Sequence, residues 1–183
     1  GHSVLDICGN RGKRSICLDL KHADGRAVAQ KLASESDVLI EGFRPGVAER
    51  LGFGYAEVKR SNPRVLYLSV SGYGQQGPFR EEPCTDTVMQ AFSGLMSVNS
   101  GNDGAPHRVG FLIVDMVTGL YAYQALATAL HARPGAEEGR HIDVSLMQSA
   151  AAIQTAKISE YALADGTPRV LNAPAGTYRT SDG

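Results

Sequence analysis

One acidic residue, Asp115, stands inside the most apolar stretch of the chain, VGFLIVDMVTGLYAYQALATALHAR. The four residues before it are hydrophobic, and the apolar residues after it recur with the period of an amphipathic helix. An aspartate in front of a helix often acts as an N-cap, whose carboxylate accepts hydrogen bonds from the first amides. The same position, at the positive end of the helix dipole and beside apolar surface, also suits a carboxylate nucleophile. Both interpretations are open from this stretch alone.

The segments that must position Asp115 alternate between strand-like and helix-like patterns. Short apolar stretches predict strands at residues 13–20, 37–41, 64–70 and about 140–146. Amphipathic or alanine-rich stretches predict helices at residues 24–34, 45–52, 56–60, 86–98, 115–133 and about 145–164. Strand, helix and strand in this order are typical of βαβ units, so we predict an α/β fold with parallel strands and flanking helices.

Two glycine-containing loops directly follow predicted strands. GFRPG comes after the strand at 37–41, and SGYGQQGPF comes after the strand at 64–70. Ligands of α/β proteins gather outside the carboxyl ends of the strands, which is where both loops are expected. Glycines let backbone amides approach a ligand, but they are also common in plain turns. The spacing here matches neither the P-loop nor the dinucleotide fingerprint.

The composition excludes several classes of function. Eighteen basic and nineteen acidic residues give a net charge of −1, which offers no broad field for nucleic acid or an anionic membrane. No apolar run approaches the roughly eighteen residues that span a bilayer, and the first residues resemble no signal peptide. The three cysteines and the scattered histidines lack metal-ligand spacing. We therefore expect a soluble cytoplasmic protein with reduced thiols, no metal site, and neither nucleic acid nor membrane as a partner.

Several segments together resemble the class III CoA-transferase family, the formyl-CoA transferase and carnitine CoA-transferase group. They are NRGKRSICLDL, DVLIEGFRPGVAERLGFGY, NPRVLYLSVSGYGQQGPF, CTDTVMQAFSGLM and VDMVTGLYAYQALATALHARPGAEEGRHIDVSL, and their order is collinear with the family. The resemblance implies a Rossmann-like large α/β domain, incomplete at both ends, over residues 1–172. Residues 173–183 would begin a crossing segment into a small domain that is mostly absent. Two chains of the family interlock, so a homodimer is implied.

The resemblance also assigns candidate site residues. The family's catalytic aspartate falls on Asp115, within the pattern Asp-x-x-Thr-Gly. The family's contacts with CoA fall on Leu18, Asp19, Leu20, Lys21, Gly42, Phe43, Arg44, Arg50, Pro83, Cys84, Thr85 and Asp86.

Some of these positions have the chemistry that CoA requires. Lys21, Arg44 and Arg50 would supply charge to its phosphates, although each one also fits a solvated surface cation. Phe43 would offer an apolar surface. In the family's arrangement Asp86 is the acid nearest to the catalytic aspartate, and two carboxylates in one site raise at least one pKa. Asp86 is equally suited to be the N-cap of the helix at 86–98.

The implied activity moves CoA from an acyl-CoA thioester to a carboxylic acid. Asp115 would attack the thioester to give a mixed anhydride, and the released thiolate would then give an aspartyl-CoA thioester. Amides of the loop at 72–77 would stabilise the oxyanions. CoA enters as a substrate, so no tightly bound cofactor is expected.

Two alternatives stay open at this point. The α-methylacyl-CoA racemase branch of the superfamily uses a His–Asp pair where this chain has Thr85 and Asp86, so one of its two bases is missing. The other alternative is that the chain is a non-catalytic CoA-binding or dimerisation module.

The sequence departs from the family pattern at two places. Gly42 replaces an Asn common in the family, and only Gly176 is glycine in the stretch at 173–176 that matches a glycine-rich loop. Formate chemistry in particular is therefore not implied.

Overall fold

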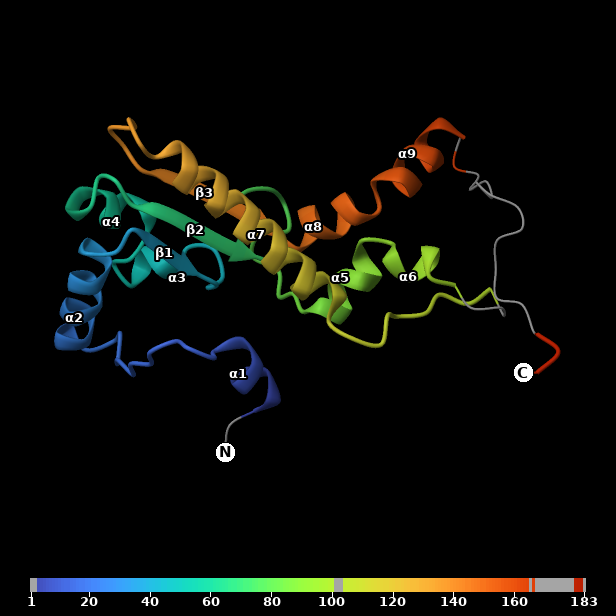
Figure 1. The fold of residues 1–183 in the computed structure, drawn as a ribbon, viewed down its shortest axis with the longest axis horizontal. Coiled ribbons are helices and arrows are strands. Elements are labelled where there is room, and N and C mark those ends of the chain that lie inside the picture. The colour runs from blue at the N-terminus through green and yellow to red at the C-terminus, as the bar shows by residue number, and fades with distance from the viewer. Residues whose placement is uncertain (1–2, 101–103, 165, 167–179, 183) are drawn as a thin grey trace.

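A parallel three-stranded sheet forms the centre of the protein (Figure 1). The computed structural model describes residues 3–100, 104–164, 166 and 180–182. The strands are β1 (Val38–Glu41), β2 (Leu66–Ser71) and β3 (Arg140–Ser145), and β2 lies in the middle. Leu66 is in register with Val38 on one side and with Arg140 on the other. The predicted α/β class with parallel strands is confirmed.

Helices cover both faces of this sheet. On one face lies the long helix α7 (Ile113–Ala132), and on the other lie α2 (Ala23–Ser34) and α4 (Tyr55–Ser61) (Figure 1). Alternate residues of β2 point to opposite faces, as the strand period requires. The core under α7 consists of Leu66, Leu68, Ala122, Leu126, Ala129 and Val144. The core on the other face consists of Ala33, Val58, Val65 and Tyr67.

A third group of helices packs beyond the carboxyl ends of the strands. These are α5 (Asp86–Phe92), α6 (Leu95–Val98), α8 (Leu146–Ile153) and α9 (Thr155–Leu163), and Figure 1 shows α8 and α9 extending away from the sheet. Met89, Leu95, Val114 and Ala150 form their buried centre. Val114 belongs to the first turn of α7, so this small core fixes the start of that helix. The short helices α1 (Val4–Gly9) and α3 (Val47–Arg50) complete the described elements.

The strand predicted at residues 13–20 is wrong. These residues form an extended connection without regular secondary structure, and Ile16 is 62% exposed. A strand requires a neighbour that accepts its backbone hydrogen bonds, and none of the three described strands pairs with this segment. The alternating pattern does mark an apolar side, because Ile16, Leu18 and Leu20 line a groove against α2 and β1.

Two helices predicted as continuous are each divided into two. The stretch at 86–98 breaks at Gly94, whose φ of 80° lies in the left-handed region that ends helices. The stretch at 145–164 breaks at Gln154, whose Nε2 donates to the carbonyls of Ala150 and Ser93. The helices at 24–34 and 56–60 are confirmed with small shifts in their ends, and only 47–50 of the helix predicted at 45–52 is helical.

Helix α7 differs from expectation in one respect. Among the described residues it is the one helix long and apolar enough to cross a membrane by length and composition, although no membrane-length run was expected. It contacts β2, β3, α5 and α8, and its first turn carries Asp115. The domain boundary predicted at residue 172 and the stretch at 173–176 lie outside the described residues.

The phenol of Tyr67 offers a test of the packing between β2 and the loop before α4. Its hydroxyl donates to the Phe53 carbonyl at 2.8 Å, the residue is 1% exposed, and burial raises its pKa. We expect Tyr67→Phe to lower the free energy of unfolding by about 1–2 kcal/mol, because a buried acceptor loses its donor. Urea denaturation measures this. Tyr55→Phe is the control, since the Tyr55 hydroxyl lies 3.5 Å from the Gly139 carbonyl. If both variants lost the same free energy of unfolding, the hydrogen bond from Tyr67 to the Phe53 carbonyl would not be stabilising, contrary to the prediction.

Candidate active site

The carboxyl ends of all three strands meet at one pocket of about 440 Å³. Gly42 follows β1, Ser71 and Gly72 end and follow β2, and Leu146 follows β3. The remaining wall comes from the start of α5 and the start of α7. The residues lining the pocket are Gly42, Val70, Ser71, Gly72, Cys84, Thr85, Asp86, Thr87, Leu112, Asp115 and Leu146. The parallel sheet therefore places a pocket where α/β proteins hold their ligands.

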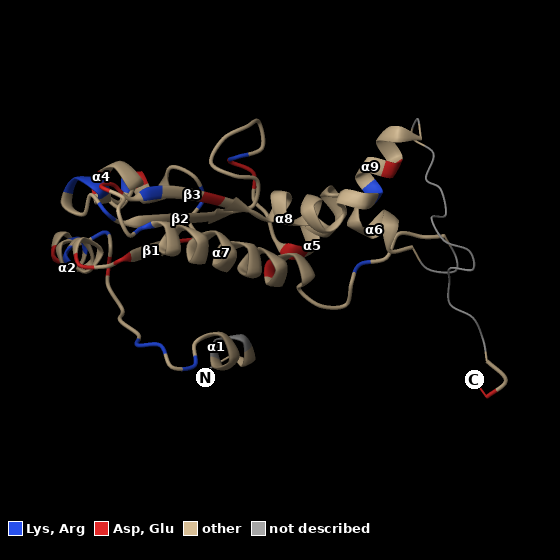
Figure 2. Ribbon diagram, turned by 45° about the horizontal axis from the view of Figure 1, so that its top comes forward, with Lys and Arg blue, Asp and Glu red and all other residues tan. Residues whose placement is uncertain are grey.

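The carboxylate of Asp86 holds the start of α7. Its Oδ2 accepts hydrogen bonds from the backbone N–H groups of Val114 at 2.8 Å and Asp115 at 3.0 Å. These are first-turn amides, which have no partner inside the helix. Asp86 is only 2% exposed, and it caps α7 from a different helix, 29 residues earlier in the chain. Figure 2 shows acidic positions at the beginnings of α5 and α7 next to each other.

Both N-cap interpretations are wrong. Asp115 is the third residue of α7, and Leu112 occupies the N-cap position without a side-chain hydrogen bond. Thr85 rather than Asp86 caps α5, and its Oγ1 accepts from the N–H of Val88 at 3.4 Å. Because Thr85 caps α5 and Asp86 caps α7, the carboxylate of Asp115 is not needed for capping.

Asp115 and the thiol of Cys84 are candidate nucleophiles in the lining of the pocket, and the environment of Cys84 disfavours its thiolate. The pKa of the Asp115 carboxyl is raised above its ordinary 3.8, first by partial burial and then by the charge of Asp86. The side chain itself remains open to solvent at the pocket. Burial likewise raises the pKa of the Cys84 thiol, and the charges of Asp115 and Asp86 raise it further. The raised pKa of the thiol disfavours the thiolate form that would attack, so Asp115 is the better candidate nucleophile of the two.

A second pocket of about 340 Å³ continues the first one. The two share Gly42, Ser71, Gly72, Cys84 and Thr85, so they form one groove that leads away from Asp115. The second pocket adds Phe43, Arg44, Pro45, Arg80, Glu82, Pro83 and Val88. Two arginines and an exposed aromatic ring thus stand in the same groove as the carboxylates of Glu82, Asp86 and Asp115. The cations and the ring suit a ligand with both anionic and flat apolar parts.

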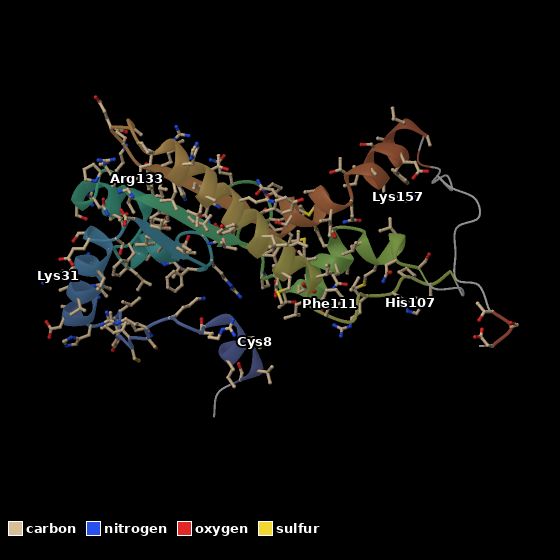
Figure 3. All side chains as sticks on the ribbon, viewed as in Figure 1. Cys8, Lys31, His107, Phe111, Arg133 and Lys157 are labelled. Carbon is tan, nitrogen blue, oxygen red and sulfur yellow. The ribbon has the colours of Figure 1, made fainter. Side chains whose placement is uncertain are left out.

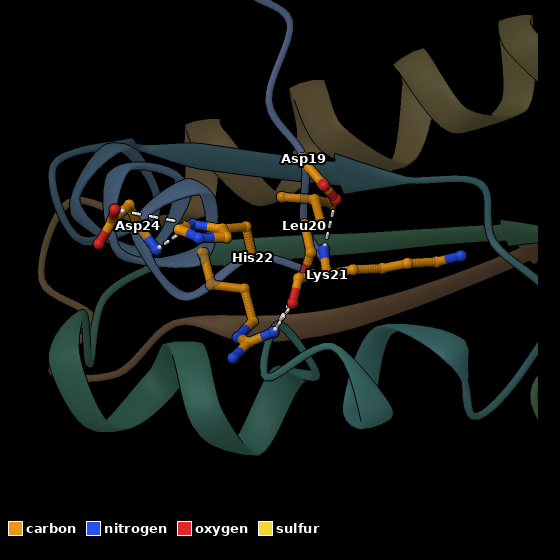
Figure 4. Close-up of polar contacts among 6 residues, drawn as sticks. Asp19, Leu20, Lys21, His22 and Asp24 are labelled. Carbon is orange, nitrogen blue, oxygen red and sulfur yellow. Dashed lines mark hydrogen bonds and ion pairs between the residues drawn. The ribbon is translucent and has the colours of Figure 1, made fainter.

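The segment from Asp19 to Lys21 lies apart from this groove. The guanidinium of Arg26 donates to the Leu20 carbonyl at 3.3 Å and to the Lys21 carbonyl at 2.8 Å (Figure 4). A Cβ on Gly25 would collide with the Asp19 carbonyl, so glycine lets the segment lie close to α2. Figure 4 shows the Lys21 side chain extending away from His22 and Asp24.

The candidate CoA contacts thus fall into three groups. Gly42, Phe43, Arg44 and 83–86 line the groove beside Asp115. Leu18 and Leu20 line the apolar groove that Phe43 shares. Asp19, Lys21 and Arg50 are exposed and line none of these pockets, and Arg50 ends the short helix α3.

The glycine-containing loop after β2 has less free donor capacity than predicted. The amide of Gly74 donates to the Ser71 hydroxyl at 3.0 Å, and the amide of Gln75 donates to Asp143 at 2.9 Å. Neither amide is therefore free for an oxyanion, although Gly72 itself lines the pocket.

A Cβ on Gly72 would collide with the side chain of Cys84, whereas the same addition at Gly42 meets nothing closer than 4.0 Å. Gly72 is required for close packing and Gly42 is not.

Arg80 and Gln90 were not predicted from the sequence as residues of the site or its support. Arg80 lines the second pocket, and its guanidinium pairs with Glu81 at 3.0 Å. Gln90 is completely buried and donates to Asp86 at 2.6 Å. The spacing of Asp86 and Gln90, four residues apart on one helix, is a signal that could have linked them. Among the described residues, no group of three or more His, Cys, Asp or Glu side chains could hold a metal ion.

The raised pKa of Asp115 gives a test that does not depend on any activity. An NMR titration of its carboxyl group should give a pKa above 3.8. Asp86→Asn should lower that pKa, because it removes the neighbouring charge. Since the folded pKa exceeds the unfolded one, Asp115 lowers stability as pH rises through the raised pKa. Asp37→Asn is the control, because Asp37 pairs with Arg133 at the other end of α7. If Asp86→Asn left the pKa of Asp115 unchanged, that result would contradict an electrostatic effect of Asp86 on Asp115.

Comparison with known proteins identifies the family. The sequence model of CoA-transferase family III matches residues 2–183. Acetyl-CoA:oxalate CoA-transferase of Acetobacter aceti is 41% identical over 180 residues, which cover 94% of this chain and 46% of that protein. Succinyl-CoA:glutarate CoA-transferase of Homo sapiens is 33% identical over 99% of this chain and 43% of that protein. The chain thus spans about half the length of the curated relatives it matches.

The fold agrees with that assignment. A CAIB/BAIF family protein from Brucella suis superposes with a TM-score of 0.86 and 33% sequence identity, over 95% of this chain and 48% of that chain. A hypothetical protein from Mycobacterium tuberculosis gives a TM-score of 0.83 and 30% identity over 95% of this chain and 47% of that one. Sequence and fold together show that the chain belongs to CoA-transferase family III.

Proposed function

We propose that the polypeptide carrying this sequence is a CoA-transferase that moves CoA from an acyl-CoA thioester to a carboxylic acid, with Asp115 as nucleophile. The observation that carries the proposal is the position of Asp115. It lies in the first turn of α7 and lines the groove formed by the carboxyl ends of the strands, and its carboxylate does not cap the helix. Family membership supplies the reaction class, and relatives in that family are named as CoA-transferases.

The first half of the proposed reaction transfers CoA to the enzyme. A carboxylate oxygen of Asp115 attacks the thioester carbonyl, the C–S bond breaks, and CoA leaves as a thiolate. The product on the protein is a mixed anhydride. The thiolate then attacks the aspartyl carbonyl carbon, the donor acid leaves as a carboxylate, and Asp115 carries CoA as a thioester.

The second half repeats these steps with the acceptor. The incoming carboxylate attacks the aspartyl thioester and releases the thiolate, which gives a second anhydride. The thiolate then attacks the acceptor's carbonyl carbon, so that the new acyl-CoA forms and the Asp115 carboxylate returns. No proton or electron is gained or lost overall. Arg44 and Arg80 line the groove and would bind the negatively charged parts of the ligand.

The racemase alternative gains no support from the groove. That chemistry requires a second base where Thr85 stands, and the hydroxyl of Thr85 already accepts from the Val88 amide as the cap of α5. A hydroxyl group without a base beside it does not remove a proton from carbon at neutral pH.

Mass spectrometry tests the nucleophile. We expect the full polypeptide, incubated with acetyl-CoA or succinyl-CoA, to gain a CoA-sized adduct that peptide mapping places on Asp115. Asp115→Asn should form no adduct and lose roughly 10³-fold or more in turnover, because the attacking carboxylate is gone. Asp37→Asn, a change at a surface ion pair, should react normally. CoA binding without any adduct in the wild type would instead support a non-catalytic binding module.

We also propose that the full polypeptide is a homodimer whose interface includes the outer face of α7. Met116, Leu120 and Tyr123 are 62%, 63% and 71% exposed, and their spacing puts them on one side of the helix. Contiguous exposed apolar side chains of this kind mark interaction surfaces.

Light scattering on the full polypeptide tests this proposal. We expect twice the chain mass for the wild type and a shift toward the single-chain mass for Leu120→Glu, because a buried charge opposes association. Leu163→Glu in α9, at a residue that is 87% exposed, is the matched control and should stay dimeric. A wild type of single-chain mass would contradict the proposal. So would a dimeric Leu120→Glu variant of lowered stability, because that result places Leu120 against the rest of its own chain.

A further inference from the structure

A buried amide, Gln90, lies behind the candidate nucleophile without touching the pocket. It belongs to α5, one turn after Asp86, and none of its surface is exposed. Its Nε2 donates to Asp86 Oδ1 at 2.6 Å and to the Phe111 carbonyl at 3.3 Å, and its Oε1 accepts from the Val109 amide at 2.8 Å. Phe111 lies just before α7 (Figure 3). One side chain thus joins α5, the approach to α7, and the carboxylate that caps α7.

These contacts fix the orientation of the amide and use the acceptor oxygens of Asp86. The backbone N–H of Val109 can only donate, so the oxygen of the Gln90 amide must face it and the nitrogen must face Asp86. Asp86 then accepts hydrogen bonds from three N–H donors, which belong to Gln90, Val114 and Asp115. Neither Asp86 nor Gln90 leaves a buried polar atom unpaired.

We infer that Gln90 is a positioning residue for Asp115, an inference that rests on the proposed function. Through Asp86 it orients the two first-turn amides of α7, and through Val109 and Phe111 it holds the segment that leads into the same turn. Asp115 is the third residue of that turn, so the direction of its carboxylate follows from this network. Because attack on a thioester requires close alignment, a misplacement of about 1 Å costs roughly 10²-fold in rate.

A purely structural glutamine is the competing explanation, and the chain contains a matched control for it. Gln154 is also buried, at 5% exposure, and its Nε2 donates to the carbonyls of Ala150 and Ser93. It joins α8 to the loop after α5 and has no hydrogen bond to Asp86 or to the segment before α7. Substitution of Gln154 therefore shows what the loss of a buried glutamine does by itself.

The experiment compares Gln90→Met, Gln90→Leu and Gln154→Met in the full polypeptide. Gln90→Met removes every hydrogen bond of the amide at similar volume. Gln90→Leu removes the same hydrogen bonds with a shorter, branched side chain, so it serves if Gln90→Met does not fold. The readouts are the rate of adduct formation on Asp115 with succinyl-CoA, the Kd for CoA, and the hydrogen-exchange rates of the Val114 and Asp115 amides.

We expect the Gln90 variants to form the adduct about 10²-fold more slowly while the Kd for CoA changes less than about threefold. The Val114 and Asp115 amides should exchange faster, whereas the later turns of α7 should be unaffected. Gln154→Met should lower the melting temperature without slowing the adduct. Folded Gln90 variants that react at the wild-type rate, or that slow no more than Gln154→Met, would overturn the inference. A wild type that forms no adduct refutes the proposed function, and hydrogen exchange then decides alone whether Gln90 holds the turn.

Discussion

The buried carboxylate of Asp86 is the constraint on which the rest of the site depends. An ionised carboxylate removed from water is stable only when hydrogen-bond donors replace its hydration. Here two donors are the first-turn amides of α7, which themselves require acceptors because no helical carbonyl reaches them. Each group satisfies the other, so α5 and α7 are fixed relative to one another. The Met89 and Val114 side chains, both fully buried, pack at the same junction.

The sheet provides the second requirement, because it brings distant segments to one edge. Three parallel strands end together, so the loop after β1, the loop after β2 and the beginning of α8 converge although they are far apart in the chain. Gly72 lets the loop after β2 pass closely over Cys84. Tyr73, Phe79 and Phe92 then form an aromatic cluster, with ring centroids 5.1 to 5.8 Å apart, that holds this loop onto α5. The groove is therefore bounded by the ends of the packed strands and by a loop that packs against α5.

Local pattern predicted those features that local interactions determine. The periodicity of residues 24–34 and the apolar runs at 37–41 and 64–70 predicted correct elements, with ends shifted by one or two residues, because burial of one face or of both faces leaves a direct mark on the sequence. The strand at 13–20 failed because a strand depends on a partner that no local pattern reveals. Asp115 was misread as a possible cap because the true cap, Asp86, lies 29 residues away. Capping across helices has no signature in either helix alone.

The electrostatics of the two acids fit the proposed chemistry. Burial and the charge of Asp86 raise the free energy of the Asp115 carboxylate, as the direction of its pKa shift shows. In the proposed reaction that carboxylate becomes part of a neutral anhydride, and the negative charge moves to the departing sulfur. Attack therefore relieves the repulsion between the two acids, and the same relief applies whichever acyl-CoA is the donor. The arrangement thus favours the neutral aspartyl intermediates of the proposed exchange, and this effect does not depend on which acyl group is bound.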